Sequence, residues 1–211
     1  MPAAIAQFAK APRSGRVKTR LQPQVSAADA AELQRALVAD VWAKLQLLED
    51  VAVYLYCDVP WTPYEHLAGS HIGLQRGCDL GARMVHCFQA LSGQGFDRIL
   101  IVGSDSPTLP AEYVRQGLEL LDRADAVLGP CEDGGYYLVG CRQPHPAMFE
   151  NVGWSTGQAL AQTESALGAI GYSVRRLPLW YDVDTVDDLH RLAADPALPE
   201  QTRAWLAAHP F

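Results

Sequence analysis

Short apolar runs alternate along this chain with segments of helical periodicity, and this alternation limits the folds that the chain can adopt. The clearest run is RILIVG at residues 98–103, which stops at a polar turn and predicts a central strand. Further strands are predicted at residues 3–9, 51–57, 72–75, 124–128, 136–141 and 173–177. Strands separated by helices indicate an α/β fold with a mainly parallel sheet and right-handed crossovers.

Helical spacing of apolar residues and cap residues mark the intervening segments. Helices are predicted at residues 26–48, 79–91, from 110 onward, 155–170 and in two short segments near the end of the chain. Ser26 with Asp29 resembles a capping box at the start of the first helix. Thr185 with Asp188 forms the same pattern ahead of the last helix but one, and Pro110 suits a first helical turn.

Length and charge favour one soluble domain over residues 1–211. The hydrophobic fraction of 49% is enough for a substantial core, and no Ser/Gly/Pro-rich linker divides the sequence. The formal charge of -7 and the isoelectric point near 5.3 argue against a nucleic-acid partner, since backbone binding draws on broad basic patches. We find no signal-peptide pattern and no apolar run of membrane-spanning length, so we expect no membrane partner and a cytoplasmic location.

Five cations gather in one loop after the first predicted strand, although the chain as a whole is acidic. The segment FAKAPRSGRVKTRL carries Lys10, Arg13, Arg16, Lys18 and Arg20. It has neither the GxxxxGK[ST] pattern of a Walker A loop nor the GxGxxG pattern of a dinucleotide site. Cations at the end of a first strand predict a site for a phosphate-bearing ligand, gripped by side chains. The alternative is a solvated basic loop.

Acidic residues follow two other predicted strands or turns. Asp105 in GSDSP stands directly after the central strand, where a carboxylate can bind a divalent cation that bridges phosphates. The alternative is a turn aspartate that bonds its own backbone. In YDVDT, Asp182 and Asp184 point the same way on an extended segment. Asp184 is the candidate for a second metal ligand, and the alternative is that both acids favour a helix N-terminus.

A third acidic group lies in CEDGGYYLVG. Glu132 and Asp133 precede the flexible pair Gly134 and Gly135, and aromatic residues follow from Tyr136. Glycines allow close approach of a ligand to the backbone, and a tyrosine can stack on a sugar ring. Asp-Gly between two strands is also a strong hairpin signal, so the segment predicts a turn as well as a functional acid.

Six segments in register resemble one family. They are FAKAPRSGRVKTRL, QRGCDLGARM, GSDSPTLP, GPCEDGGYYLVG, WST at residues 154–156 and DVDT at residues 182–185. This set, which runs from Phe8 to about Leu189, resembles the DUF2064 family of GT-A-fold nucleotide-diphospho-sugar transferases. Some members of that family are called arsenosugar-biosynthesis glycosyltransferases. The resemblance implies a three-layer α/β/α, Rossmann-like GT-A fold with a mostly parallel central sheet.

The resemblance also implies a set of site residues. A divalent metal, Mg²⁺ or Mn²⁺, would be held by Asp105 and Asp184, and Lys18 with Arg20 would clamp a pyrophosphate. The full set for nucleotide and phosphate is Lys10, Arg13, Gly15, Lys18, Arg20, Gln75 and Gly81, the last two near the base. The acceptor or sugar would lie against Gly134, Gly135, Tyr136, Trp154, Ser155 and Thr156.

The implied partners are a nucleotide or nucleotide-sugar and a small-molecule acceptor. The leading hypothesis is sugar transfer to that acceptor, with either inversion or retention at the anomeric carbon. If the reaction inverts this carbon, Asp133 or Glu132 is the general base. The first alternative is nucleotidyl transfer to a phosphorylated metabolite with release of pyrophosphate. It is favoured by the single Asp105 of GSDSP, because familiar glycosyltransferases carry DxD at this position. A non-catalytic nucleotide-sugar binder is the third hypothesis, and it would not need both Asp105 and Asp184.

Overall fold

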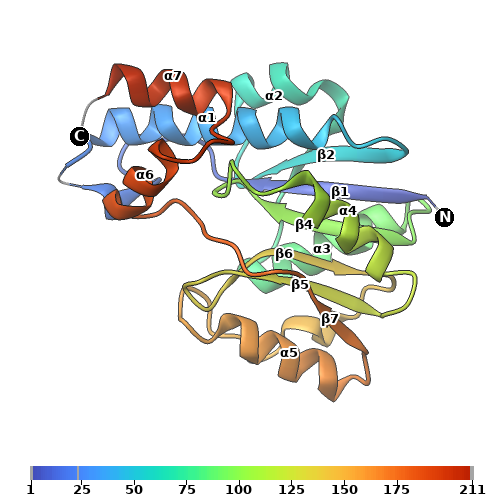
Figure 1. Ribbon diagram of the computed structural model, residues 1–211. Coiled ribbons are helices and arrows are strands. Elements are labelled where there is room, and N and C mark those ends of the chain that lie inside the picture. Colours follow the sequence, from blue (N-terminus) through green and yellow to red (C-terminus); the bar gives the residue numbers. More distant parts are fainter. Residues whose placement is uncertain (1, 23, 210–211) are drawn as a thin grey trace.

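A sheet of seven strands runs through the part of the chain that the computed structural model describes, residues 2–22 and 24–209 (Figure 1). In chain order the strands are β1 (Ala3–Ala9), β2 (Val51–Cys57), β3 (Ile72–Leu74), β4 (Arg98–Gly103), β5 (Ala126–Pro130), β6 (Tyr136–Cys141) and β7 (Val174–Arg176). Their order across the sheet is β3-β2-β1-β4-β6-β5-β7, so RILIVG is the central strand, as predicted. Only β6 runs antiparallel to its neighbours, which confirms a mostly parallel sheet.

Helices cover both faces of the sheet and complete a three-layer α/β/α arrangement (Figure 1). One face packs against α1 (Ala27–Leu45), α2 (Thr62–Ala68) and α4 (Ala111–Leu120). The other packs against α3 (Leu80–Ser92), α5 (Ala159–Ala169) and the 3₁₀ turn η3 (Pro146–Phe149). Side chains of β4 alternate between these faces: Leu100 and Val102 join the first core cluster, whereas Ile99 and Ile101 join the second.

A third, smaller cluster lies beside the sheet. It joins the first half of α1 to α6 (Val186–Ala193), α7 (Glu200–Ala208) and the 3₁₀ turn η1 (Thr19–Leu21). The remaining short element is the 3₁₀ turn η2 (Gly69–His71). Among the residues described, no helix is long and apolar enough to cross a membrane.

The predicted caps are present, but one helix begins later than predicted. Ser26 accepts a hydrogen bond from the amide of Asp29, and Thr185 with Asp188 forms a complete capping box. The prediction of a helix from residue 155 was wrong, since α5 begins at Ala159. Ser155 has a φ of 60°, and the Thr156 hydroxyl donates to the carbonyl of Gly153, so these residues form a turn.

The predicted Asp-Gly turn joins β5 to β6 and brings its residues to the carboxyl edge of the sheet. Within it, Asp133 Oδ1 accepts a hydrogen bond from the Gly135 amide at 2.9 Å. Gly134 has a φ of +84°, and a Cβ placed on it would lie 2.1 Å from the carbonyl oxygen of Gly157. Glycine is required there by both backbone conformation and space.

We expect Gly134→Ala to destabilise the protein more than Gly171→Ala. Both glycines have positive φ, but a Cβ on Gly171 would have no neighbour within 4 Å. Gly171→Ala should therefore cost only the left-handed conformation, about 1–2 kcal/mol. Gly134→Ala adds a clash between two backbone segments. Urea unfolding of the two variants measures this difference, and equal losses would contradict the close contact with Gly157.

Candidate functional site

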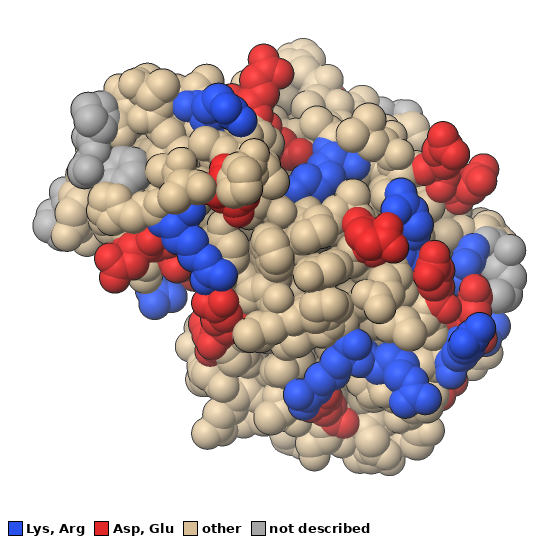
Figure 2. All heavy atoms as spheres, viewed as in Figure 1, with Lys and Arg blue, Asp and Glu red and all other residues tan. Residues whose placement is uncertain are grey.

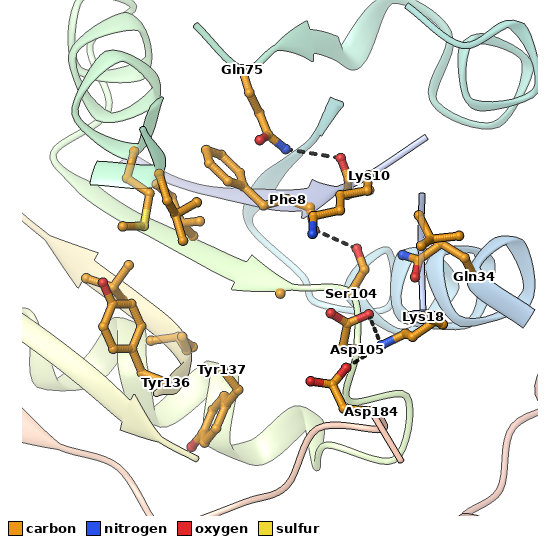
Figure 3. Close-up of a pocket in the computed structure, with 18 residues that line it drawn as sticks. Phe8, Lys10, Lys18, Gln34, Gln75, Ser104, Asp105, Tyr136, Tyr137 and Asp184 are labelled. Carbon is orange, nitrogen blue, oxygen red and sulfur yellow. Dashed lines mark hydrogen bonds and ion pairs between the residues drawn. The ribbon is translucent and has the colours of Figure 1, made fainter. Parts of the chain in front are cut away.

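The loop after β4 presents Asp105 at the carboxyl edge of the sheet. Alternate residues of this loop point inward and are held by their hydroxyl groups. Ser104 donates to the Phe8 carbonyl at 2.7 Å, Ser106 donates to the Asp182 carboxylate, and Thr108 shares a hydrogen bond with the Tyr181 hydroxyl. These three side chains are buried, and the alternation leaves Asp105 between them directed into a cavity (Figure 3).

The ammonium group of Lys18 lies between the two predicted metal ligands, Asp105 and Asp184 (Figure 3). Its Nζ is 2.6 Å from Asp105 Oδ1 and 3.1 Å from Asp184 Oδ1, and it donates to the Val183 carbonyl at 2.7 Å. The side chain is only 3% exposed, and the residue has a φ of 48°. Burial alone would lower the pKa of Lys18, but the carboxylates of Asp105 and Asp184 outweigh it and raise the pKa.

Asp182 is a third carboxylate in this region, which the sequence analysis did not assign as a ligand. It accepts hydrogen bonds from the Ser106 hydroxyl and the Cys131 thiol. Burial, and then the charge of Asp105, raise the pKa of Asp182 to about 6. The two-residue spacing in YDVDT already placed it on the same side as Asp184, and that signal could have identified it.

These carboxylates suit a hard divalent cation. Asp105 and Asp184 already contact one cationic atom, Lys18 Nζ, and Asp105 Oδ1 has no hydrogen-bond partner in the described chain besides this ion pair. Burial alone would raise the pKa of Asp184. The charges of Lys18 and Arg20 outweigh burial and lower this pKa below its ordinary value, so the carboxylate is ionised. Oxygen ligands of this charge are those that Mg²⁺ and Mn²⁺ prefer. We therefore keep Asp105 and Asp184 as the proposed metal pair and add Asp182 as their neighbour.

A cavity of about 700 Å³ lies in front of this cluster. Its basic side is formed by Lys10, Arg16, Lys18 and Arg20. Arg20 also contacts Asp184 at 3.3 Å. From the predicted nucleotide and phosphate set, Arg13 and Gly15 are exposed and do not line this cavity, whereas Arg16, which that set omitted, does.

The opposite side of the same cavity is aromatic and polar. It contains the predicted acceptor residues Gly135, Tyr136, Trp154, Ser155 and Thr156. The rings of Tyr136 and Trp154 meet edge to face, with centroids 6.5 Å apart. Gly134 is not among its lining residues, and its place is fixed by the backbone contact with Gly157. The structure thus brings cations, carboxylates and aromatic rings from distant segments to one cavity.

The two candidate bases differ in their surroundings. Glu132 forms an ion pair with Arg191 at 2.8 Å, and Arg191 also lies over the Tyr181 ring. Asp133 lines the larger cavity, and its Oδ1 accepts a hydrogen bond from the Gly135 amide of its own turn. Asp133 is therefore the better placed of the two to meet a ligand.

A second cavity of about 250 Å³ adjoins the first and extends over the ends of β1 and β4 (Figure 3). Gln75 lines it, and its amide donates to the carbonyls of Ala9 and Tyr56. Gly81 lines neither cavity. It is buried, and a Cβ there would lie 2.8 Å from Phe149 and 2.9 Å from Trp154. The close packing of α3 against these two side chains explains why a glycine is present at position 81. The sequence had instead predicted that Gly81 lies near the base of the nucleotide.

Another group of possible metal ligands lies away from the sheet edge. Asp29, Glu32 and His209 are the one set of three whose ligand atoms all fall within 4.8 Å among the residues described. His209 Nε2 is 3.5 Å from Asp29 and 3.6 Å from Glu32. These contacts join α1 to the chain after α7, and we assign them to packing of those helices. On the face of the molecule drawn in Figure 2, Lys and Arg side chains are mixed with Asp and Glu side chains.

The strand order, the helical layers and the cavity at the carboxyl edge define the nucleotide-diphospho-sugar transferase fold. A crystal structure titled "putative nucleotide-diphospho-sugar transferase" from Desulfovibrio desulfuricans G20 is 34% identical to this chain, with a TM-score of 0.88. The alignment covers 98% of this chain and 94% of that one. CMP:2-keto-3-deoxy-manno-octonic acid synthetase complexed with CTP has a TM-score of 0.60 at 15% identity, over 92% of this chain and 98% of that one, which supports the fold.

Residues 38–156 match the family model described as "Uncharacterized protein conserved in bacteria (DUF2064)", and the chain belongs to this family. A curated relative, 2-phospho-L-lactate guanylyltransferase of Methanothermobacter thermautotrophicus, is 29% identical over 119 residues. That match covers 56% of this chain and 53% of the relative, so it spans about half of each. The predicted class of enzyme, a transferase, is the class that the names of these relatives give.

We expect Lys18→Met to weaken the free protein and to strengthen its binding of a divalent cation alone. The Lys18 ammonium is buried, but the carboxylates of Asp105 and Asp184 are 41% and 36% exposed, so its removal should cost less than the ~3–5 kcal/mol of a fully buried ion pair. Mn²⁺ should restore much of this loss, since it would meet carboxylates freed from the ammonium. Urea unfolding with and without Mn²⁺ and calorimetric Mn²⁺ titration measure both effects.

Lys10→Met is the matched control for Lys18→Met. Lys10 lines the same cavities, but it is exposed, so this change removes a positive charge from the same loop without removing the ammonium that contacts Asp105 and Asp184. Its effect on Mn²⁺ affinity should be smaller. Equal gains in the two variants would indicate long-range attraction alone.

We expect the stability conferred by Asp182 to fall as pH rises. The pKa of Asp182 is about 6 in the folded protein, above its ordinary value of 3.8. Between pH 4 and about 6 the unfolded chain loses this proton first, so wild-type stability decreases across that window. Asp182→Asn stays neutral and should lack the decrease. Thermal unfolding in EDTA from pH 4 to pH 7 tests this, and parallel profiles would refute the raised pKa.

Proposed function

We propose that this protein is a metal-dependent transferase that moves a sugar from a nucleoside-diphosphate donor to a small acceptor. The observation that carries the proposal is the continuous cavity of about 700 Å³, in which basic side chains face aromatic and hydroxyl side chains. The basic side suits a diphosphate and the aromatic side suits a sugar ring. The 34% identical relative named as a nucleotide-diphospho-sugar transferase supports this proposal.

In this proposal the chain's own residues stabilise the departing diphosphate. Lys10, Arg16 and Arg20 line the cavity from the exposed loop, and their charges favour the anion that forms when the sugar bond breaks. Lys18 is the buried member of the group. A divalent cation held by Asp105 and Asp184 would supply further charge neutralisation on the phosphate oxygens.

Asp133 is the proposed general base for the acceptor. The hydroxyl oxygen of the acceptor forms a bond to the anomeric carbon while the bond from that carbon to the diphosphate breaks. The hydroxyl proton passes to the carboxylate of Asp133, and the diphosphate leaves with its electron pair. The tyrosine and tryptophan of the opposite wall, Tyr136 and Trp154, would orient the sugar ring.

Nucleotidyl transfer is the second candidate, and two observations favour it. The 29% identical relative is a guanylyltransferase, and the loop after β4 carries the single Asp105. In this reaction a phosphate oxygen of the acceptor attacks the α-phosphorus of a triphosphate, and pyrophosphate leaves. No proton has to be removed from the nucleophile, so Asp133 would have no role as base.

Asp133→Asn separates the two candidates. If sugar transfer uses Asp133 as base, kcat should fall about 10²- to 10⁴-fold while donor affinity changes little. Glu132→Gln is the control, because Glu132 is paired with Arg191 and should affect turnover much less. Steady-state kinetics with a panel of nucleotide sugars measures these effects. Pyrophosphate release from a triphosphate, with no turnover of any nucleotide sugar, would replace sugar transfer by nucleotidyl transfer.

A further inference from the structure

Gln34 is a buried polar residue of α1 that faces the smaller cavity (Figure 3). It is 4% exposed, and its neighbours on the helix, Leu33, Leu37 and Val38, are fully buried core residues. An apolar side chain would be the more stable choice at such a position, because burial removes an amide from water. The polar atoms of Gln34 remain accessible from the cavity, so a ligand bound there can reach them.

No residue in the described ranges forms a hydrogen bond with the Gln34 side chain. The neutral polar side chains that line this cavity are Gln34, Gln75, Ser104, Tyr136 and Tyr137. The other four each form a hydrogen bond with the protein: Gln75 with Ala9, Ser104 with Phe8, Tyr136 with Thr163 and Tyr137 with Pro178. The Gln34 side chain has no hydrogen bond to any residue in the described ranges, and its amide opens into the cavity.

A second buried glutamine shows what a structural amide looks like here. Gln7 on β1 is 0% exposed and lies beneath the same helix. Its Nε2 donates to the Val38 carbonyl and to the Ser104 hydroxyl, both at 3.0 Å. Gln7 thus ties α1 to the loop that carries Asp105. Gln7 therefore fixes α1 against the sheet through its hydrogen bonds, whereas Gln34 makes no such contact with the described residues.

The chemistry of the missing partner follows from the position of Gln34 in the cavity. Gln34 lies beside Lys18, whereas Phe8 and Tyr136 lie at the other end of the cavity (Figure 3). A cation in place of Gln34 would be drawn to Asp105 and Asp184, as Lys18 is. The neutral amide of Gln34 is attracted to these carboxylates less strongly than an ammonium would be. Its N–H groups therefore remain free to donate to an anionic ligand.

We propose that the side-chain amide of Gln34 donates a hydrogen bond to a phosphate oxygen of the bound nucleotide. This assignment rests on the nucleotide binding of the proposed function and adds a neutral donor to its basic loop. It makes Gln34 a binding residue that no pattern in the sequence marks. It also requires that the amide reduce the stability of the free protein and increase the affinity for phosphate, which a purely structural residue would not do.

Gln34→Met tests the assignment, because methionine has a similar shape and lacks the amide. The free variant should unfold at the same temperature as the wild type or higher. With Mg²⁺ present, its affinity for a nucleoside diphosphate and for inorganic pyrophosphate should fall about 10- to 100-fold, the range for a hydrogen bond to a charged group. Gln7→Met is the matched contrast and should lower the unfolding temperature, since it removes two hydrogen bonds inside the protein.

The outcomes separate this assignment from the proposed function. Wild-type affinity in Gln34→Met, or a loss of stability as large as that of Gln7→Met, would overturn the role of Gln34 alone. A loss for the nucleoside diphosphate without a loss for pyrophosphate would place the contact on the nucleoside and overturn the phosphate assignment. A wild type that binds none of these ligands would remove the proposed function and this assignment together.

Discussion

The ion pairs of Lys18 with Asp105 and Asp184 hold together the segments that form the candidate site. Lys18 lies in the loop after β1, Asp105 follows β4, and Asp184 precedes α6, so one buried ammonium joins three distant parts of the chain. Its bond to the Val183 carbonyl spans 165 residues. Buried charges are tolerated only when paired, and the rest of this edge is arranged so that the pairing is complete.

The sheet supplies the rigid part of this arrangement. Parallel strands β1 and β4 end at the same edge, and antiparallel β6 begins there, which brings the turn at Asp133 to face the basic loop. Hydroxyl groups of Ser104, Ser106 and Thr108 then hold the loop after β4 at alternate positions. The position of Asp105 is therefore set by strand geometry and buried hydrogen bonds. The positions of the exposed cationic side chains in the loop after β1 are less constrained.

Local signals in the sequence predicted the features that depend on neighbouring residues. The apolar run RILIVG, the caps at Ser26 and Thr185 and the turn at Gly134 are of this kind, and the structure contains them all. Long-range contacts were not predictable in this way. Three features depend on segments that meet only after folding. They are the pairing of Lys18, the burial of Asp182 beside Ser106, and the position of Gln34 at the cavity without a hydrogen-bond partner among the described residues.

The same long-range pairing constrains how a ligand can bind. A phosphate group that enters the cavity meets Lys18 with its charge already matched by Asp105 and Asp184, so it gains little from this ammonium unless another cation takes over the carboxylates. A divalent cation would bind these carboxylates in place of the ammonium. When the cation binds alone, the positive charge of the Lys18 ammonium beside the same carboxylates opposes it. Each ligand removes an obstacle to the other, which is the thermodynamic meaning of coupled binding. Metal and nucleotide are therefore expected to bind this site as a pair.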